Sequence, residues 1–161
     1  MTPLNLQSDD GDEIPGVNAI DINPAHQLLA LGIEGNGTVQ FWDPRSRSRV
    51  GILRLPKTRL MPPPAMSGDP AMGGISVTAV SSRGDGLSYA VGMSTGHTLL
   101  YDIRSSKSFA FKDQGYGLPI KKVIWIEGGS RMAGDGMVLS ADKKVIKIWD
   151  KNNASCFPPF F

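Results

Sequence analysis

The chain has 161 residues, and its 17 Lys and Arg against 15 Asp and Glu give a formal net charge of +2 at pH 7. This near balance neither favours nor excludes a nucleic-acid partner. The single cysteine, Cys156, excludes an internal disulfide and is typical of a reducing compartment. No apolar run approaches the roughly 20 residues of a membrane span, and the acidic start is unlike a signal peptide, so we expect a soluble intracellular protein.

Residues 1–16 are polar and acidic, and they end in the turn sequence Ile14-Pro15-Gly16. The following unit, residues 17–55, contains four predicted strands, at 17–22, 28–32, 38–43 and 50–55. In the third of them Val39 and Phe41 alternate with the polar Gln40. This alternation predicts a strand with one buried face.

Residues 56–74 form an insertion with five prolines and three glycines. Prolines lack an amide donor and glycines are costly to order, so this composition favours neither a strand nor a helix. We interpret the insertion as a mobile surface loop. The alternative is that its methionines, Met61, Met66 and Met72, dock on a partner.

Two further units repeat the plan of the first. Residues 75–112 contain predicted strands at 76–80, 88–92, 98–102 and 107–111, and residues 113–153 contain strands at 120–125, 137–141 and 145–150. The third unit lacks an outer strand, because the aberrant tail, residues 154–161, carries the adjacent Pro158 and Pro159, which cannot donate to a central ladder. We therefore expect a fragment or truncated product of a longer protein.

The three units are in register at an aromatic–aspartate pair that ends each third strand. Asp43, Asp102 and Asp150 are 59 and 48 residues apart, and WD40 propeller blades recur at roughly 40–45 residues with a Trp-Asp signature. The pattern predicts an all-β, WD40-type β-propeller: three consecutive blades of the four-stranded kind in an incomplete ring. Three blades do not close a ring. We therefore expect the outer faces of the first and third blades to be uncovered, at apolar residues such as Val17, Ile22, Ile146 and Ile148.

The sequence offers no group that looks catalytic. The two histidines, His26 and His97, have no Cys, Asp or Glu at metal-ligand spacing. The glycine-rich residues 32–37 resemble a phosphate-binding loop only superficially, because no helix follows them. We predict a protein that is not an enzyme, with no cofactor, no metal and no small-molecule substrate.

The repeated positions have a structural interpretation first. The aromatic residues should fill space between sheets, and each aspartate should accept backbone N–H groups at a strand end. These positions are Trp42, Asp43, Tyr101, Asp102, Trp149 and Asp150. The arginines near them leave two interpretations open, a solvated loop, which we favour, and bidentate contact with phosphate. The candidates for contact with a partner or RNA are Arg45, Arg47, Arg49, Arg104 and Tyr116.

Two segments, 41–51 and 112–121, go beyond a generic repeat, and 138–142 with 145–150 agrees with them. They resemble the nucleolar WD40 protein of the small-subunit processome, the family called essential nuclear protein two or nucleolar protein ten, over about residues 17–152. The resemblance implies a non-catalytic scaffold in the nucleolus (nucleus) that acts in ribosome biogenesis and 18S rRNA maturation. It also implies other ribosome-assembly proteins as partners, pre-ribosomal RNA as a candidate neighbour, and no membrane. The alternative is a generic WD40 adaptor in another intracellular complex.

Overall fold

The computed structural model describes residues 6, 16–56, 74–127 and 136–152. Within these residues the chain forms eleven strands in three antiparallel sheets and no helix. None of the described residues therefore provides a helix that could cross a membrane. The predictions for the acidic N-terminal residues, the insertion and the tail fall largely outside the described residues.

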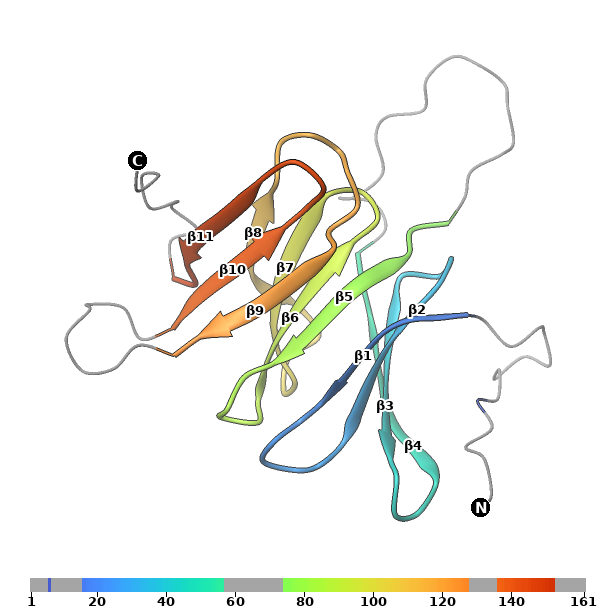
Figure 1. Cartoon of the computed structure of the whole chain (residues 1–161). Helices are drawn as coiled ribbons and strands as arrows, with labels where there is room; N and C mark the ends of the chain where they lie inside the picture. Colours follow the sequence, from blue (N-terminus) through green and yellow to red (C-terminus); the bar gives the residue numbers. More distant parts are fainter. Residues whose placement is uncertain (1–5, 7–15, 57–73, 128–135, 153–161) are drawn as a thin grey trace.

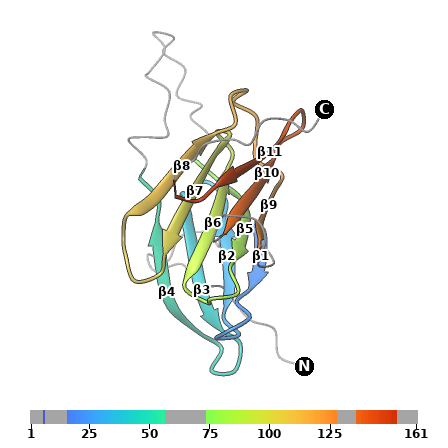
Figure 2. The same cartoon turned by 90° about the vertical axis from the view of Figure 1, so that its left-hand side faces the viewer.

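The three sheets follow one another along the chain and pack side by side (Figures 1 and 2). Blade one is β1 (Val17–Ile22), β2 (Leu29–Ile33), β3 (Thr38–Asp43) and β4 (Ser48–Arg54). Blade two is β5 (Val77–Ser82), β6 (Ser88–Met93), β7 (His97–Asp102) and β8 (Ser108–Asp113). Blade three is β9 (Lys122–Ile126), β10 (Met137–Ala141) and β11 (Ile146–Asp150). Each sheet is a meander of neighbouring strands, as expected for successive propeller blades.

The predicted strands are present with small shifts at their ends. Strand β8 ends at Asp113, two residues after its predicted end, and β9 begins at Lys122, two residues after its predicted start. A difference of the same size occurs in β4, which begins at Ser48, two residues before its predicted start. The cause is a β-bulge, because Trp42 pairs with Arg49 and Phe41 with Gly51, which leaves Val50 unpaired. A bulged residue turns out of the ladder, and Val50 is correspondingly 54% exposed. Blade two repeats this bulge between β7 and β8, so the two blades share their backbone irregularities as well as their sequence pattern.

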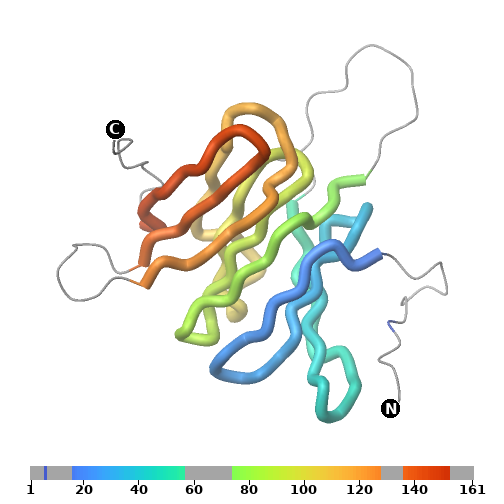
Figure 3. Tube along the Cα trace, in the orientation of Figure 1, coloured from blue at the N-terminus to red at the C-terminus, as the bar shows by residue number. Residues whose placement is uncertain are grey.

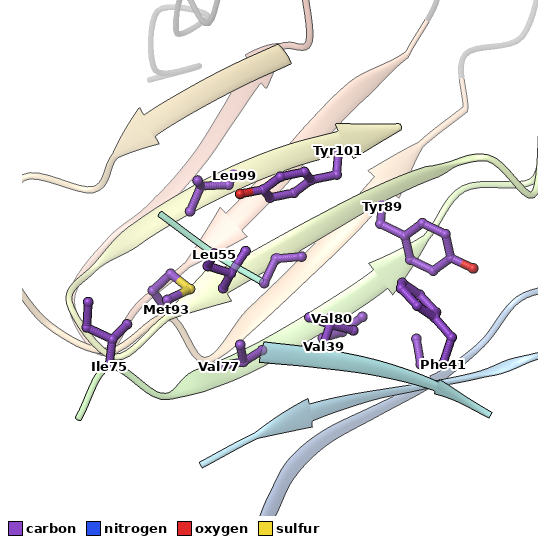
Figure 4. Close-up of a cluster of buried hydrophobic side chains, with 12 residues drawn as sticks. Val39, Phe41, Leu55, Ile75, Val77, Val80, Tyr89, Met93, Leu99 and Tyr101 are labelled. Carbon is purple, nitrogen blue, oxygen red and sulfur yellow. The ribbon is translucent and has the colours of Figure 1, made fainter. Parts of the chain in front are cut away.

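The largest core lies between blades one and two (Figure 4). Val39 and Phe41 of β3 share this core with Leu99 and Tyr101 of β7, and the Phe41 ring packs edge-on against Tyr89 with centroids 5.0 Å apart. All five side chains are at most 5% exposed. Burying aromatic and branched side chains of this size contributes about 1.5–3 kcal/mol each. The interface between sheets, not any single sheet, therefore holds the fold together.

Two glycines at equivalent positions allow the blades to approach closely. A Cβ atom on Gly32 would lie 2.5 Å from a side-chain carbon of Val77, and one on Gly92 would lie 2.6 Å from Ile120. Each glycine is in the second strand of its blade and lies against the residues with which the next blade begins. Larger residues would force the sheets apart at both interfaces.

The outer faces of the array are covered only in part. Ile22 is 60% exposed and Ile146 is 68% exposed, as expected for faces without a neighbouring blade. The same expectation is wrong for Val17 and Ile148, which are half-buried. The reason for Val17 is a third cluster on that face, formed by Leu31, Ile33 and Trp42, against which Val17, Leu29 and Leu6 pack.

We expect these two faces to drive self-association. The Ile22→Lys, Ile146→Lys double variant should elute as a monomer at all concentrations, whereas the parent chain should move to larger species across about a hundredfold rise in concentration. Size-exclusion chromatography with light scattering measures this. Val50→Lys removes another apolar residue that is more than half exposed, at the β4 bulge, and should behave as the parent. A parent chain that stays monomeric throughout would contradict the expectation.

Candidate functional site

The third strand of each blade ends in an aspartate whose carboxylate accepts a hydrogen bond from the turn that follows. Oδ1 of Asp43 and Oδ1 of Asp102 each accept the backbone N–H two residues further on, at 2.8 and 2.9 Å. Oδ1 of Asp150 accepts the equivalent N–H at 2.7 Å. These are Asx turns, which fix the chain direction after the strand. The three carboxylates are thus engaged by the turns of their own blades.

The aromatic partners of these aspartates differ between blades. Trp149 is fully buried, and its Nε1 donates to Oγ of Ser140 at 3.1 Å, while that hydroxyl donates to Oε1 of Gln114 at 2.9 Å. In blade one, Nε1 of Trp42 donates instead to Oε1 of Gln40 at 3.0 Å. In both blades the indole N–H, which would be costly to bury alone, has a side-chain acceptor.

Two of the arginines predicted to contact a partner or RNA are held by their own blades. Nη2 of Arg45 donates to Oε1 of Gln27 at 2.8 Å. Arg104 donates to both carboxylate oxygens of Asp102, from Nε at 2.9 Å and from Nη2 at 2.6 Å. This paired geometry is the one an arginine would use on phosphate. A phosphate at Arg104 would therefore compete with Asp102.

The five predicted contact residues do not form one site. Arg45 and Arg47 lie in the β3–β4 turn and Arg49 follows it in β4, whereas Arg104 lies in the β7–β8 turn of the next blade. Each turn is at the lower end of its own blade in Figure 1. Tyr116 follows β8 and lies with the connection to β9, at the opposite end of the molecule. The arginines and the tyrosine therefore face different surroundings.

A groove between the outer parts of blades one and two encloses a cavity of about 510 Å³. Phe41, Tyr89 and Tyr101 line it, and β4 forms one wall. Gly51 opens the groove at this wall, since a Cβ atom there would meet only the Phe41 ring, at 3.7 Å. Arg54 also lines the groove. This cavity is not predictable from the sequence, because it depends on how two sheets diverge.

The two tyrosines of the groove have different hydroxyl environments. Oη of Tyr89 accepts a hydrogen bond from Nδ2 of Asn23. Oη of Tyr101 is buried and makes no hydrogen bond of normal geometry, although the Ser108 side chain is near enough to offset part of the effect of burial. Burial raises the pKa of Tyr101 to about 12. The Tyr101 hydroxyl thus stays protonated at neutral pH, so it does not act as a base in the groove.

We expect the Asp102 carboxyl to titrate at a pKa of about 2, because hydrogen bonds from the Arg104 side chain and backbone favour its charged form. Its ordinary pKa is 3.8. The pair therefore stabilises the fold above about pH 4, and this stabilisation is lost as the pH falls toward 2. Carboxyl carbon NMR shifts during a pH titration measure the pKa.

Arg104→Gln should raise the pKa of Asp102 clearly. Arg45→Gln is the matched control at Asp43, whose pKa is lowered first by the Arg45 backbone N–H and only weakly by the Arg45 charge. The control variant should therefore leave the Asp43 titration nearly unchanged. An Asp102 carboxyl that titrates near its ordinary pKa in the parent chain would contradict the assignment.

Two buried polar residues that the sequence did not reveal organise the blade interfaces. Asn23, which is fully buried, spans from the β1–β2 turn to blade two, where its Nδ2 donates to the Gly86 carbonyl at 2.7 Å. Gln114, 1% exposed, spans from blade two to blade three, where its Nε2 donates to the Val145 carbonyl at 3.0 Å. Asn23 precedes Pro24, and this pair is typical of a turn, but the partner of Asn23 is 63 residues away and no local pattern identifies it.

Comparison with known proteins identifies a matching family model and several similar proteins. Residues 1–160 match the family model described as nucleolar protein 10-like, N-terminal domain. The chain is 50% identical over 158 residues to the ribosome biogenesis protein enp2 homolog of Schizosaccharomyces pombe. It is 40% identical over 157 residues to the ribosome biogenesis protein ENP2 of Saccharomyces cerevisiae, and each alignment covers 98% of the chain.

The similarity extends to a vertebrate protein. The chain is 38% identical over 141 residues, 87% of its length, to nucleolar protein 10 of Homo sapiens. These alignments cover 24%, 19% and 18% of the Schizosaccharomyces, Saccharomyces and human proteins. The chain thus spans about a quarter or less of the curated relatives it matches.

Proposed function

Since the chain belongs to the nucleolar protein 10-like family, whose N-terminal domain it matches over residues 1–160, we propose that it is a scaffold in ribosome biogenesis. The family predicted from two short sequence segments is confirmed by this match. The observation that carries the proposal is the similarity along nearly the whole chain to proteins named for ribosome biogenesis or for the nucleolus. We accordingly propose the nucleolus as its location.

Within ribosome biogenesis, we propose the small-subunit processome and the maturation of 18S rRNA. The partners would be other ribosome-assembly proteins, with pre-ribosomal RNA as a further neighbour. The fold is compatible with a role in contact, because three antiparallel sheets present sets of turns and a groove lined by aromatic, arginine and serine side chains.

The polar groups of the described residues favour a non-catalytic role. The carboxylates of Asp43, Asp85, Asp102, Asp142 and Asp150 each accept backbone N–H groups of their own turns. Groups of three or more potential metal ligands do not occur in the described parts of the chain. The groove offers a protonated tyrosine hydroxyl and no base beside it. These carboxylates stabilise the turns between strands, which is a structural role and the kind that a scaffold needs.

A domain exchange in Saccharomyces cerevisiae tests the proposal. The 157 residues of ENP2 that align with this chain are replaced by it, and the hybrid is the only copy in the cell. We expect the hybrid to co-sediment with early pre-ribosomal particles and to sustain normal levels of 18S rRNA. A Gly32→Phe hybrid, which forces blades one and two apart, is the control for an unfolded domain.

The outcomes separate the proposal from its alternatives. A folded hybrid that sediments apart from pre-ribosomal particles would overturn the scaffold role in ribosome biogenesis. Co-sedimentation with a loss of large-subunit rRNA and normal 18S rRNA would overturn the small-subunit assignment alone.

A further inference from the structure

A lysine-rich surface covers the end of the molecule where blades two and three meet. It is built from the connection between β8 and β9 and from the β10–β11 turn, which lie together at the top of Figures 1 and 3. The Gln114 side chain donates to the Val145 carbonyl at 3.0 Å, and the Lys121 N–H donates to the Ala141 carbonyl at 2.7 Å. The two segments are thus fixed against each other. We call this the lysine surface, which consists of Tyr116, Lys121, Lys122, Lys143, Lys144 and Lys147.

The charge of this surface is strongly positive. The two segments that carry it, residues 113–122 and 142–147, contain five lysines and two carboxylates, those of Asp113 and Asp142. Asp142 is directed inward, since one oxygen accepts two backbone N–H groups of the turn and the other is buried. Asp113 is partly occupied by the Gly115 N–H, at 2.7 Å. Four of the lysines, all except Lys147, are exposed, so their ammonium groups are available to an anionic partner.

An aromatic ring lies among these charges. Tyr116 is 56% exposed, and Nζ of Lys144 is 5.3 Å from the centre of its ring. The glycines on either side, Gly115 at φ 92° and Gly117 at φ 61°, adopt the left-handed conformation that other residues rarely take. This tight backbone presents the ring outward. Aromatic side chains are usually buried, so the exposure of Tyr116 at a structured position indicates a surface that binds a partner.

We propose that the lysine surface binds single-stranded RNA, with the lysines on successive phosphates and a base stacked on Tyr116. This inference rests on the proposed role in ribosome biogenesis and names the surface and ligand. A cationic track beside an aromatic ring is the arrangement that binds single-stranded nucleic acid without base-specific contacts. An acidic protein segment would satisfy the lysines and leave the ring without a partner. Arg45 and Arg104, by comparison, already pair within their own blades.

Fluorescence anisotropy with a labelled single-stranded RNA of about 12 nucleotides measures the affinity. The triple variant Lys121→Gln, Lys143→Gln, Lys144→Gln should bind at least about tenfold more weakly at low salt. Three lost phosphate contacts should also reduce the slope of log K against log salt by about 2, at about 0.7 per phosphate. Tyr116→Ala should weaken binding about tenfold, and Tyr116→Phe should keep the affinity, because stacking needs the ring and not the hydroxyl.

The matched control is Arg45→Gln, Arg47→Gln, Arg49→Gln, which removes the same charge at the opposite end. It should change the affinity less than about twofold, and circular dichroism of every variant should match the parent. An equal loss in this control, or unchanged binding in Tyr116→Ala, would overturn the proposal. Competition by a poly-glutamate peptide as effective as that by unlabelled RNA would overturn it in favour of an acidic protein partner.

The same lysine variants in the yeast hybrid distinguish this proposal from the one it rests on. Weakened RNA binding with retained co-sedimentation supports the lysine surface and leaves the scaffold role intact. Unaltered RNA binding overturns only the lysine surface. A parent hybrid that fails to co-sediment, while the isolated chain binds RNA through Tyr116, overturns only the scaffold role.

Discussion

Trp149→Ala should lower the free energy of unfolding by about 3–5 kcal/mol, the usual cost of deleting a buried tryptophan side chain. Trp149 is fully buried in the cluster that joins blades two and three, where it accompanies Val123, Trp125 and Val138. Its removal leaves a large cavity that β-sheets fill poorly, because their backbones are fixed by the ladder. It also leaves the Ser140 hydroxyl without the indole donor.

Urea denaturation followed by circular dichroism measures this loss. The Ile22→Lys, Ile146→Lys background keeps the chain monomeric, so the midpoint does not depend on concentration. Trp149→Phe helps to separate the two causes, since it loses the hydrogen bond but only part of the buried volume. Tyr116→Ala deletes an aromatic ring that is 56% exposed and should cost less than about 0.5 kcal/mol. A loss below about 1 kcal/mol in Trp149→Ala would contradict the assigned packing.

The sequence predicted the blades well because each strand carries its own signal. The alternation of Val39, Gln40 and Phe41 specifies a strand whatever lies around it, and the observed β3 has the predicted bounds. The turn glycines Gly35, Gly37 and Gly96 have positive φ angles, which hairpins of this kind require. Because the same strand pattern recurs in all three units, each unit supported the strand predictions for the others. The differences between predicted and observed strands were therefore confined to strand ends and bulges.

Much of what the sequence did not predict depends on how strands and sheets pack against one another. The groove beside Tyr101 exists because two twisted sheets diverge toward their outer strands, and no single strand encodes that divergence. The half-buried state of Val17 depends on Trp42 and Leu6, which are far from it in sequence. The arginines were recognised as a group, but the pairing of Arg104 with Asp102 removes that group's apparent uniformity. Most of the contacts that the sequence did not predict are thus long-range, but the Arg104–Asp102 pair, only two residues apart, was missed as well.

Among the contacts between blades that the sequence did not predict, the hydrogen bonds of Asn23 should have the greatest effect on stability. Its Nδ2 donates to the Gly86 carbonyl at 2.7 Å and to the Tyr89 hydroxyl, both in blade two. Its Oδ1 accepts the N–H groups of Ala25 at 2.9 Å and His26 at 3.1 Å, in its own turn. A single buried amide therefore fixes the β1–β2 turn and attaches it to the neighbouring sheet.

Asn23→Ala should lower the free energy of unfolding by about 2–4 kcal/mol, since leaving a buried polar group unpaired costs about 1–3 kcal/mol and more than one group is left. Asn36→Ala is the matched control. Oδ1 of Asn36 accepts the Thr38 N–H at 3.1 Å within one turn, so its loss should cost about 1 kcal/mol. Equal losses in the two variants would show that the link between blades adds nothing.

Asn23→Asp gives the sharper test, because it changes the donor and keeps the shape. At pH 7 the new carboxylate still accepts the Ala25 and His26 N–H groups, but it places a buried negative charge against the Gly86 carbonyl. Burial raises the pKa of such a carboxyl. Stability should therefore be low at neutral pH and recover as the pH falls through this raised pKa, since the protonated carboxyl can again donate to Gly86. A variant whose urea midpoint, relative to the parent, does not rise between pH 7 and pH 5 would show that Asn23 does not act as a donor between the blades.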